Sequence, residues 1–404
     1  ADLDGGGMGV PSDFPVHARD RHGPCREHDR RQAPPRAGRR GHRTAAGLIL
    51  WFAALAASAD PLRIATYNVE LSRDGPGLLL RDILDGAPDV LAAVAVIAEV
   101  SPDVLLLSGF DYDHDLHALR AFATALSEAR QPYEYLLAFP PNSGVRNGRD
   151  MDGDGQAGTP RDAQGYGEFA GQGGMALLSR LPVDHGASRD FSLYLWHDLP
   201  DALLGGQEPP EGAFPDQRLS SVGHWDIALA LPDEREIRLW AFHATPPVFD
   251  GPEDRNGRRN HDEAAFWLAY LEGELSEKPV EAPFVLLGDA NMDPADGDGR
   301  PGALHSLLSH PHLIDPAPRS AGGRAAADRD GGANLTQGGD PSLDTADWRD
   351  GPGDPGNLRV DYVLPSSHWT VLGSGVHWPL AGSAAEIAAA ASRHRIVWVD
   401  IELP

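Results

Sequence analysis

The stretch Phe284-Val-Leu-Leu-Gly288-Asp289-Ala290-Asn291-Met-Asp-Pro294 decides the fold, because an apolar strand ends there in two polar side chains. Asp289 and Asn291 are two residues apart, so both would leave an extended chain on the same side. A carboxylate beside a neutral amide suits phosphoryl transfer. The acid can orient or deprotonate a water, and the amide can donate to a phosphate oxygen without adding negative charge. The alternative is a plain turn in which these side chains cap the backbone.

Four further segments place a polar side chain at a strand boundary. They are Ile64-Ala-Thr-Tyr-Asn68, Trp240-Ala-Phe-His243, Arg359-Val-Asp361-Tyr-Val-Leu and Ser392-Arg393-His394-Arg395-Ile-Val-Trp. A histidine whose second ring nitrogen bonds a carboxylate keeps one tautomer and gains basicity, which serves proton transfer. Each segment alone is more often structural than catalytic. Together they give the order Asn, His, Asp-x-Asn, Asp, His.

This order and its strand contexts resemble the endonuclease/exonuclease/phosphatase superfamily, the DNase I-like group, from Leu62 to the C-terminus. The resemblance implies a phosphoesterase that uses Mg²⁺ or Mn²⁺. It assigns Asn68 to seating metal and phosphate, and Asp289 with Asn291 to the Gly-Asp-x-Asn pair. It also makes His394 the final histidine, held by Asp361, and His243 the central histidine that contacts the phosphoryl group.

The strand and helix patterns independently favour an α+β fold. Short β-rich runs outnumber the helical segments, and three-to-four spacing of apolar residues is confined to 83–100, 115–129 and 262–275. Such a pattern predicts two packed sheets with helices outside rather than a βαβ repeat. The resemblance implies the same architecture, a two-sheet β-sandwich flanked by helices on both sides, in four layers.

Two positions depart from the family pattern. The strand Pro102-Asp-Val-Leu-Leu-Leu107 is followed by Ser108-Gly109, where the family places a metal-binding Glu, and Arg393 stands where the family has an Asp. A strand continuing past Gly109 would turn Asp111 and Asp113 to the side of Gly109. We therefore expect Asp111, or failing it Asp113, to bind the metal together with Asn68. We expect Arg393 to bind the phosphate, a task that its planar guanidinium suits.

Three long polar loops, 140–174, 248–261 and 316–357, are of the length that is usually functional or disordered. In the first, Asp150-Met-Asp152-Gly-Asp154-Gly155 matches the opening of a calcium loop, but its twelfth position is Arg161, so it is not an EF-hand. A structural Ca²⁺ at these acids and a solvated acidic turn both remain open. Two further acidic groups are weaker cases of the same kind, Asp293 with Asp296 and Asp298, and Asp250 with Glu253 and Asp254. The third loop reads as a flexible insertion.

The first residues read differently from the rest. We expect 1–44 to be a disordered leader that need not be translated, 45–59 to be a signal peptide, and 60–404 to be the catalytic domain. An apolar run follows Arg39, Arg40 and Arg43 and ends on Ala57-Ser58-Ala59, and it is shorter than the roughly 18–20 residues that cross a bilayer. The sequence therefore predicts a secreted or periplasmic protein without a membrane span in its mature part. Its single cysteine, Cys25, falls in the leader, which excludes a thiol enzyme.

The formal net charge of −26 argues against avid non-specific binding of nucleic acid, because an acidic surface repels a phosphate backbone. We expect a monomer that acts on a phosphate ester. The competing hypothesis is a catalytically impaired, calcium-stabilised extracellular binding protein of the same fold. An acyl hydrolase is excluded because the Gly-x-Ser-x-Gly pattern is absent.

Overall fold

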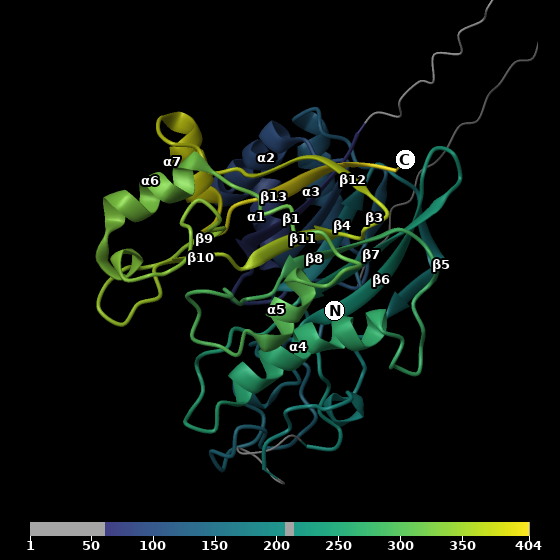
Figure 1. Ribbon diagram of the computed structural model, residues 1–404, viewed down its shortest axis with the longest axis vertical. Coiled ribbons are helices and arrows are strands. Elements are labelled where there is room, and N and C mark those ends of the chain that lie inside the picture. The colour runs from purple at the N-terminus through teal and green to yellow at the C-terminus, as the bar shows by residue number, and fades with distance from the viewer. Residues whose placement is uncertain (1–60, 207–213, 404) are drawn as a thin grey trace, which may run out of the picture. The chain divides into compact units, whose positions relative to one another are not determined.

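Two β-sheets packed face to face organise the protein, whose computed structural model describes residues 61–206 and 214–403. Ser58–Pro404 forms one compact unit. The predicted leader and signal peptide lie outside the described residues. Figure 1 shows the strands of both sheets crossing the middle of this unit, with helices on either side of them.

The first sheet has six strands in the order β12-β13-β1-β2-β4-β3. Its central strand β1 alternates its side chains between two apolar clusters: Ala65, Tyr67 and Val69 face helices, and Ile64 faces the second sheet. This is the two-residue period expected of a strand that is covered on both faces. The strands are β1 (Leu62–Leu71), β2 (Val104–Phe110), β3 (Tyr135–Leu137), β4 (Gly174–Ser179), β12 (Thr370–Val376) and β13 (Val397–Glu402).

The second sheet has five strands in the order β11-β8-β7-β6-β5, with β7 and β8 parallel and the other pairs antiparallel. A two-stranded ribbon of β9 and β10 is separate from both sheets. The strands of the second sheet and the ribbon are β5 (Val183–Asp190), β6 (Gly223–Ala230), β7 (Glu236–His243), β8 (Phe284–Asp289), β11 (Asp361–Pro365), β9 (Ala346–Asp347) and β10 (Asn357–Leu358).

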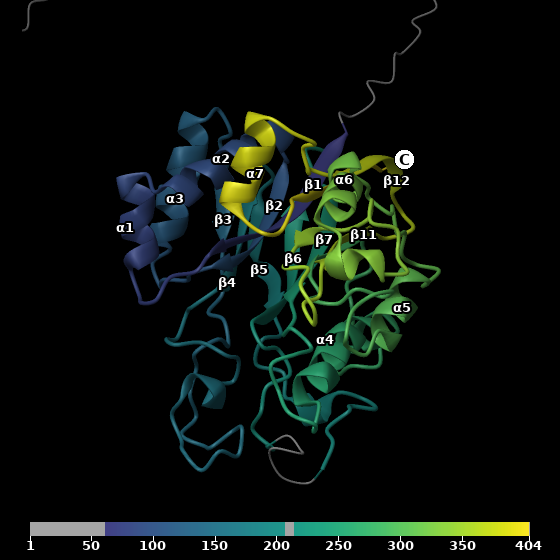
Figure 2. The same cartoon turned by 90° about the vertical axis from the view of Figure 1, so that its left-hand side faces the viewer.

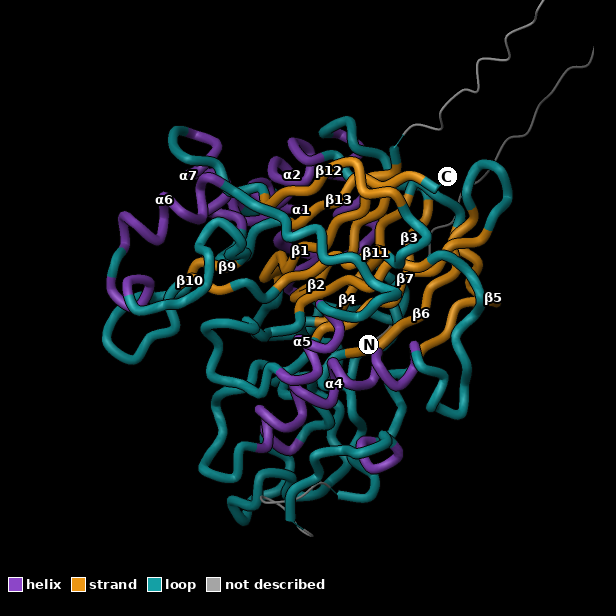
Figure 3. Tube along the Cα trace, viewed as in Figure 1, coloured by secondary structure: helices purple, strands orange, loops and turns teal. Residues whose placement is uncertain are grey.

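Helices cover the outer face of each sheet, as Figures 2 and 3 show. The helices α1, α2, α3 and α7 share an apolar cluster with the first sheet, and α4 and α5 share one with the second. The predicted α+β sandwich with helices on both sides is thereby confirmed. The helices are α1 (Leu78–Asp85), α2 (Pro88–Val100), α3 (His117–Glu128), α4 (Arg255–Leu271), α5 (Gly302–Leu308), α6 (Ala321–Asp330) and α7 (Ser383–Ala391). Among the described residues no helix combines the length and apolar character that crossing a membrane requires.

Three predicted segments differ from the structure. The single helix expected over 83–100 is two helices, because the chain turns at Gly86, in the left-handed region at φ 67, and Pro88 begins the next helix. The helix expected from residue 262 begins at Arg255, inside a predicted loop. The supposed flexible insertion at 316–357 is folded, since it contains α6, β9 and a 3₁₀ turn at Gly332–Leu335.

Candidate active site

Strand register brings three of the predicted site residues into one row at an end of the second sheet. His243 is the last residue of β7 and pairs with Asp289, the last residue of β8, in the parallel ladder. Asp361, the first residue of β11, pairs with Asp289 from the other side. The three side chains therefore come from adjacent strands although they lie far apart in the sequence. His243 Nε2 is 3.5 Å from Asp289 Oδ2.

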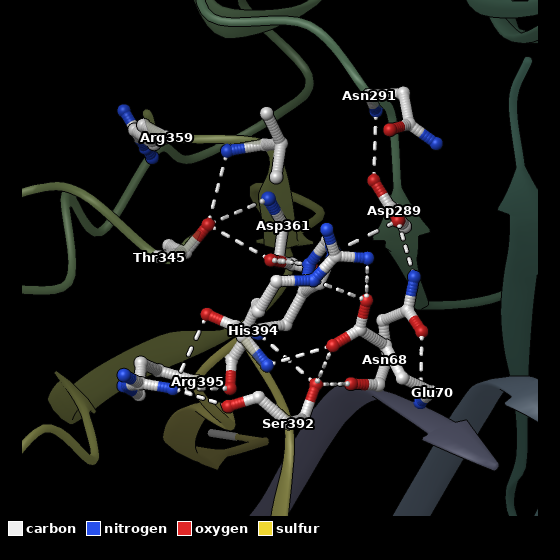
Figure 4. Close-up of polar contacts among 12 residues, drawn as sticks. Asn68, Glu70, Asp289, Asn291, Thr345, Arg359, Asp361, Ser392, His394 and Arg395 are labelled. Atoms are coloured by element: carbon white, nitrogen blue, oxygen red, sulfur yellow. Dashed lines mark hydrogen bonds and ion pairs between the residues drawn. The ribbon is translucent and has the colours of Figure 1, made fainter. Parts of the chain in front are cut away.

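Asn68 on β1 and His394 just before β13 lie against these three residues from the side of the first sheet (Figure 4). Asn68 Nδ2 donates to Asp289 Oδ2 at 2.8 Å. His394 lies just before β13, and its Nδ1 is 2.9 Å from Asp361 Oδ2 and 4.0 Å from Asp289 Oδ2. The structure thus brings Asn68, His243, Asp289, Asp361 and His394 together at the junction of the two sheets.

Asn291 takes part in a capped turn and also keeps an amide N–H for a ligand, so it combines the two alternatives that the sequence left open. Its backbone N–H donates to Asp289 Oδ1 at 2.8 Å, and its φ of 48° turns the chain out of the strand, so a turn capped by the Asp289 carboxylate is present. Its Nδ2 donates to Ala244 O at 2.9 Å. An amide nitrogen carries two N–H groups, so one remains for a substrate oxygen.

Burial and neighbouring charges set the protonation of the centre. Burial raises the pKa of Asp289, and the nearby Asp361 carboxylate raises it further. Burial lowers the pKa of His243, which favours the neutral ring. Burial would also lower the pKa of His394, but Asp361 and Asp289 outweigh it and raise that pKa to about 9. The site therefore combines a neutral and a charged imidazole with a carboxylate that has gained basicity.

The donor set fits a divalent cation. Asp361 Oδ1 is buried and has no hydrogen-bond partner among the residues that the structure describes, which is costly unless a cation or a proton satisfies it. Carboxylate oxygens of Asp289 and Asp361 lie within 4.8 Å of one another, and His394 Nδ1 lies beside them at 2.9 Å from Asp361 Oδ2. Carboxylate and amide oxygens, here from Asp289, Asp361 and Asn68, are the ligands that Mg²⁺ and Mn²⁺ prefer.

The structure gives Asp111, Asp113 and Arg393 other partners than the expected ones. The Asp111 carboxylate accepts the backbone N–H groups of Arg73 and Gly173, each at 2.9 Å. Asp113 accepts two backbone N–H groups at the start of α3. The φ of Gly109 is 66°, so the chain does not pass through it as the plain extended strand on which the prediction for these two acids relied. The Arg393 guanidinium binds a carboxylate, Glu70, rather than standing free for phosphate.

Sequence reasoning missed three residues that support the centre. The Thr345 hydroxyl donates to Asp361 Oδ2 at 2.8 Å, from the segment that was expected to be flexible. The Ser392 hydroxyl donates to Asn68 O at 2.7 Å and accepts the His394 N–H at 3.0 Å. Glu70 accepts from Ser392 and Arg393. The bonds of Glu70 to Ser392 and Arg393 span more than 300 residues of sequence, so no local pattern contains them. The position of Glu70 two residues after Asn68 was the one sequence signal for it.

The predicted calcium loop is built differently from its motif. Ligand atoms of Asp150, Asp152 and the buried Asp162 lie within 4.8 Å of one another, and Asp162 takes the place expected of Asp154. The Asp154 carboxylate accepts the Gln156 N–H instead. In the weaker acidic group that follows Asn291, the carboxylates of Asp293 and Asp296 each accept backbone N–H groups.

A cleft of about 1080 Å³ opens beside the centre. His243 and Thr245 line it on the side of the second sheet, and Asp250 and Glu253 line it from the loop that precedes α4. The long loop at 140–174 also lines it, with Arg161 and Tyr166 among its residues. Residues of both long loops therefore line the cleft that leads to His243.

The fold is thus a two-sheet sandwich with a His, Asp and Asn centre at its strand ends. The model of the Endonuclease/Exonuclease/phosphatase family matches residues 65–394, and the chain belongs to that family. A crystal structure of an endonuclease/exonuclease/phosphatase from Beutenbergia cavernae is similar, with a TM-score of 0.51 at 17% identity over 85% of this chain and 72% of that one.

Two further solved structures are similar at lower scores. A family protein from Leptotrichia buccalis has a TM-score of 0.46 at 17% identity over 85% of this chain and 100% of that one. A mannosyl-6-phosphatase from Bacteroides thetaiotaomicron has a TM-score of 0.44 at 15% identity over 84% of this chain and 99% of that one. No curated protein matches the sequence.

Proposed function

We propose that the protein is a divalent-metal-dependent phosphoesterase that hydrolyses phosphodiester or phosphomonoester bonds. The observation that carries the proposal is the convergence of His243, Asp289, Asp361 and His394 beside Asn68 at one junction of the two sheets. Phosphoryl transfer needs such convergence, because donors must surround the equatorial oxygens while the nucleophile and leaving group stay in line.

Each side chain has a task that its surroundings support. Asp289, whose pKa is raised, accepts the proton of the attacking water. His394, kept charged by Asp361, stabilises the negative charge that develops on the phosphoryl oxygens. The neutral His243 and the remaining N–H of Asn291 donate to the phosphoryl group. Asn68, Asp289 and Asp361 would hold Mg²⁺ or Mn²⁺, which neutralises phosphate charge when bound.

Three further expectations belong to this proposal. The cluster of Asp150, Asp152 and Asp162 supports a structural Ca²⁺, because three carboxylates lie within reach of one ion. Export is proposed from the apolar run at 45–59 alone. We propose a monomer whose acidic surface favours small phosphate esters over long nucleic acids.

Activity on a panel of phosphate esters tests the proposal. Bis-p-nitrophenyl phosphate, p-nitrophenyl phosphate, DNA, sphingomyelin and nucleotides are each incubated with Mg²⁺, Mn²⁺ or Ca²⁺, and with EDTA. The proposal expects hydrolysis of at least one ester that EDTA abolishes and added Mg²⁺ or Mn²⁺ restores. Folded protein without activity under every condition would contradict it and would favour the binding-protein hypothesis.

A further inference from the structure

Glu70 places an additional carboxylate against the centre. Its Oε2 accepts the backbone N–H of Arg393 at 2.7 Å and the Ser392 hydroxyl at 3.2 Å, and its Oε1 accepts Arg393 Nε at 2.8 Å. Figure 4 shows its side chain beside Asn68, on the side of His394.

The local backbone explains why this carboxylate comes from β1. Glu70 has a φ of 49°, a left-handed conformation that non-glycine residues rarely adopt, and its N–H donates to Asn68 Oδ1 at 3.2 Å. The neighbouring strand cannot supply a side chain here. A Cβ on Gly109 would lie 2.4 Å from Asn68 Oδ1 and 3.1 Å from the Glu70 nitrogen. The strained turn at Glu70 therefore delivers the acid that position 109 lacks.

Arg393 occupies the outward side of this carboxylate. Both Nε and Nη2 of its guanidinium bind Glu70 Oε1, while its side chain is 64% exposed and that of Glu70 is 24% exposed. An ion pair whose guanidinium is solvent-exposed contributes little to stability, so Arg393 can leave for water at small cost while the half-buried Glu70 stays in place. Its departure would free the two lone-pair directions of Oε1.

We propose that Glu70 is a ligand of the divalent cation, and that Arg393 is its counter-ion in the metal-free protein and competes with the cation for Oε1. This inference rests on the proposed function, because it assumes that a divalent cation binds beside Asn68 and Asp289. In the metal-free protein the guanidinium compensates part of the charge of Glu70, Asp289 and Asp361. When the cation binds, Arg393 is released to solvent.

The competition predicts opposite effects for the two members of the ion pair. Mn²⁺ binding to the metal-free protein is measured by calorimetry and by the loss of the free Mn²⁺ signal in electron paramagnetic resonance. Glu70→Gln should weaken Mn²⁺ binding at least tenfold, in the range found when a group that supports a metal site is removed. Arg393→Gln should bind Mn²⁺ several-fold more tightly than the wild type. Arg63→Gln, which breaks the ion pair with Asp400 at the far end of β1, is the matched control and should leave Mn²⁺ affinity unchanged.

The outcomes separate this inference from the proposed function. If the wild type binds Mn²⁺ and both Glu70→Gln and Arg393→Gln bind it equally well while losing the same thermal stability, the pair is only structural and the inference is overturned. Weaker inorganic phosphate binding by Arg393→Gln at unchanged Mn²⁺ affinity would also overturn it, because Arg393 would then be a phosphate ligand. A wild type that binds no Mn²⁺ would overturn both the inference and the metal dependence in the proposed function.

Discussion

Replacing Thr345 by Val tests whether the segment at 316–357 is part of the active centre. The Thr345 hydroxyl is buried, donates to Asp361 Oδ2 at 2.8 Å, and accepts the backbone N–H groups of Val360 and Asp361 at 3.0 Å each. Valine keeps the shape of the side chain but leaves both N–H groups without an acceptor and removes one donor from the carboxylate.

The magnitude follows from these three bonds. Each unpaired buried donor costs roughly 1–3 kcal/mol, and partial relaxation brings the expected loss of unfolding free energy to about 3 kcal/mol. Asp361 also holds His394, so a small displacement of Asp361 moves the imidazole. We expect kcat to fall roughly ten- to a hundredfold, the scale of a misplacement by about 1 Å.

Urea unfolding and steady-state hydrolysis of bis-p-nitrophenyl phosphate check both numbers. Thr345→Ser keeps the hydroxyl and should stay close to the wild type in kcat. Thr336→Val is the matched control, because the Thr336 hydroxyl is exposed and bonds only a local carbonyl. A Thr345→Val variant that loses stability but keeps its kcat would refute the coupling of this segment to His394. A variant that changes in neither would refute the hydrogen bonds themselves.

Two further predictions concern stability. Burial lowers the pKa of His224 to about 4, so the unfolded chain gains a proton below about pH 6.5 while the folded protein does not. The unfolding free energy should therefore fall by up to roughly 3 kcal/mol as the pH drops from 6.5 to 4. Urea unfolding should show a smaller dependence on pH in His224→Gln than in His185→Gln, the control variant of an exposed histidine. Gly288→Ala should unfold at much lower urea than Gly148→Ala, because a Cβ on Gly288 would lie 1.9 Å from Phe242 O whereas one on Gly148 would meet nothing within 4 Å. Equal losses in the two glycine variants would show that positive φ, and not the close approach of the strands, sets the cost.

Local patterns predicted the part of the centre that lies at strand ends. Asp289 and His243 end apolar strands in the sequence and in the structure, and β-pairing then aligns them. The same patterns failed where one residue changes the chain direction. The positive φ of Gly109 interrupts the extended strand on which the prediction for Asp111 and Asp113 relied.

The remaining site residues depend on contacts that no local pattern contains. The ion pair of Glu70 with Arg393 joins the two ends of the described chain. Thr345 comes from a Gly-, Asp- and Ala-rich segment whose composition resembles that of a flexible loop. That segment is ordered by packing, since Ala326 is buried in the apolar cluster between the sheets. The break between α1 and α2 could have been predicted, because Gly86 and Pro88 are ordinary signals for ending and starting a helix.

The most direct test of the central claim is the metal-stimulated rate of phosphodiester hydrolysis by Asp289→Asn compared with the wild type. Asparagine keeps the size of the side chain but cannot accept the proton of the attacking water, so we expect a loss of kcat of at least about a thousandfold, combining the loss of a general base with weaker metal binding. Asp103→Asn, which breaks a half-buried ion pair with Arg180 outside the centre, should keep the wild-type rate. A folded Asp289→Asn variant with a kcat within twofold of the wild type would contradict the assignment of this centre.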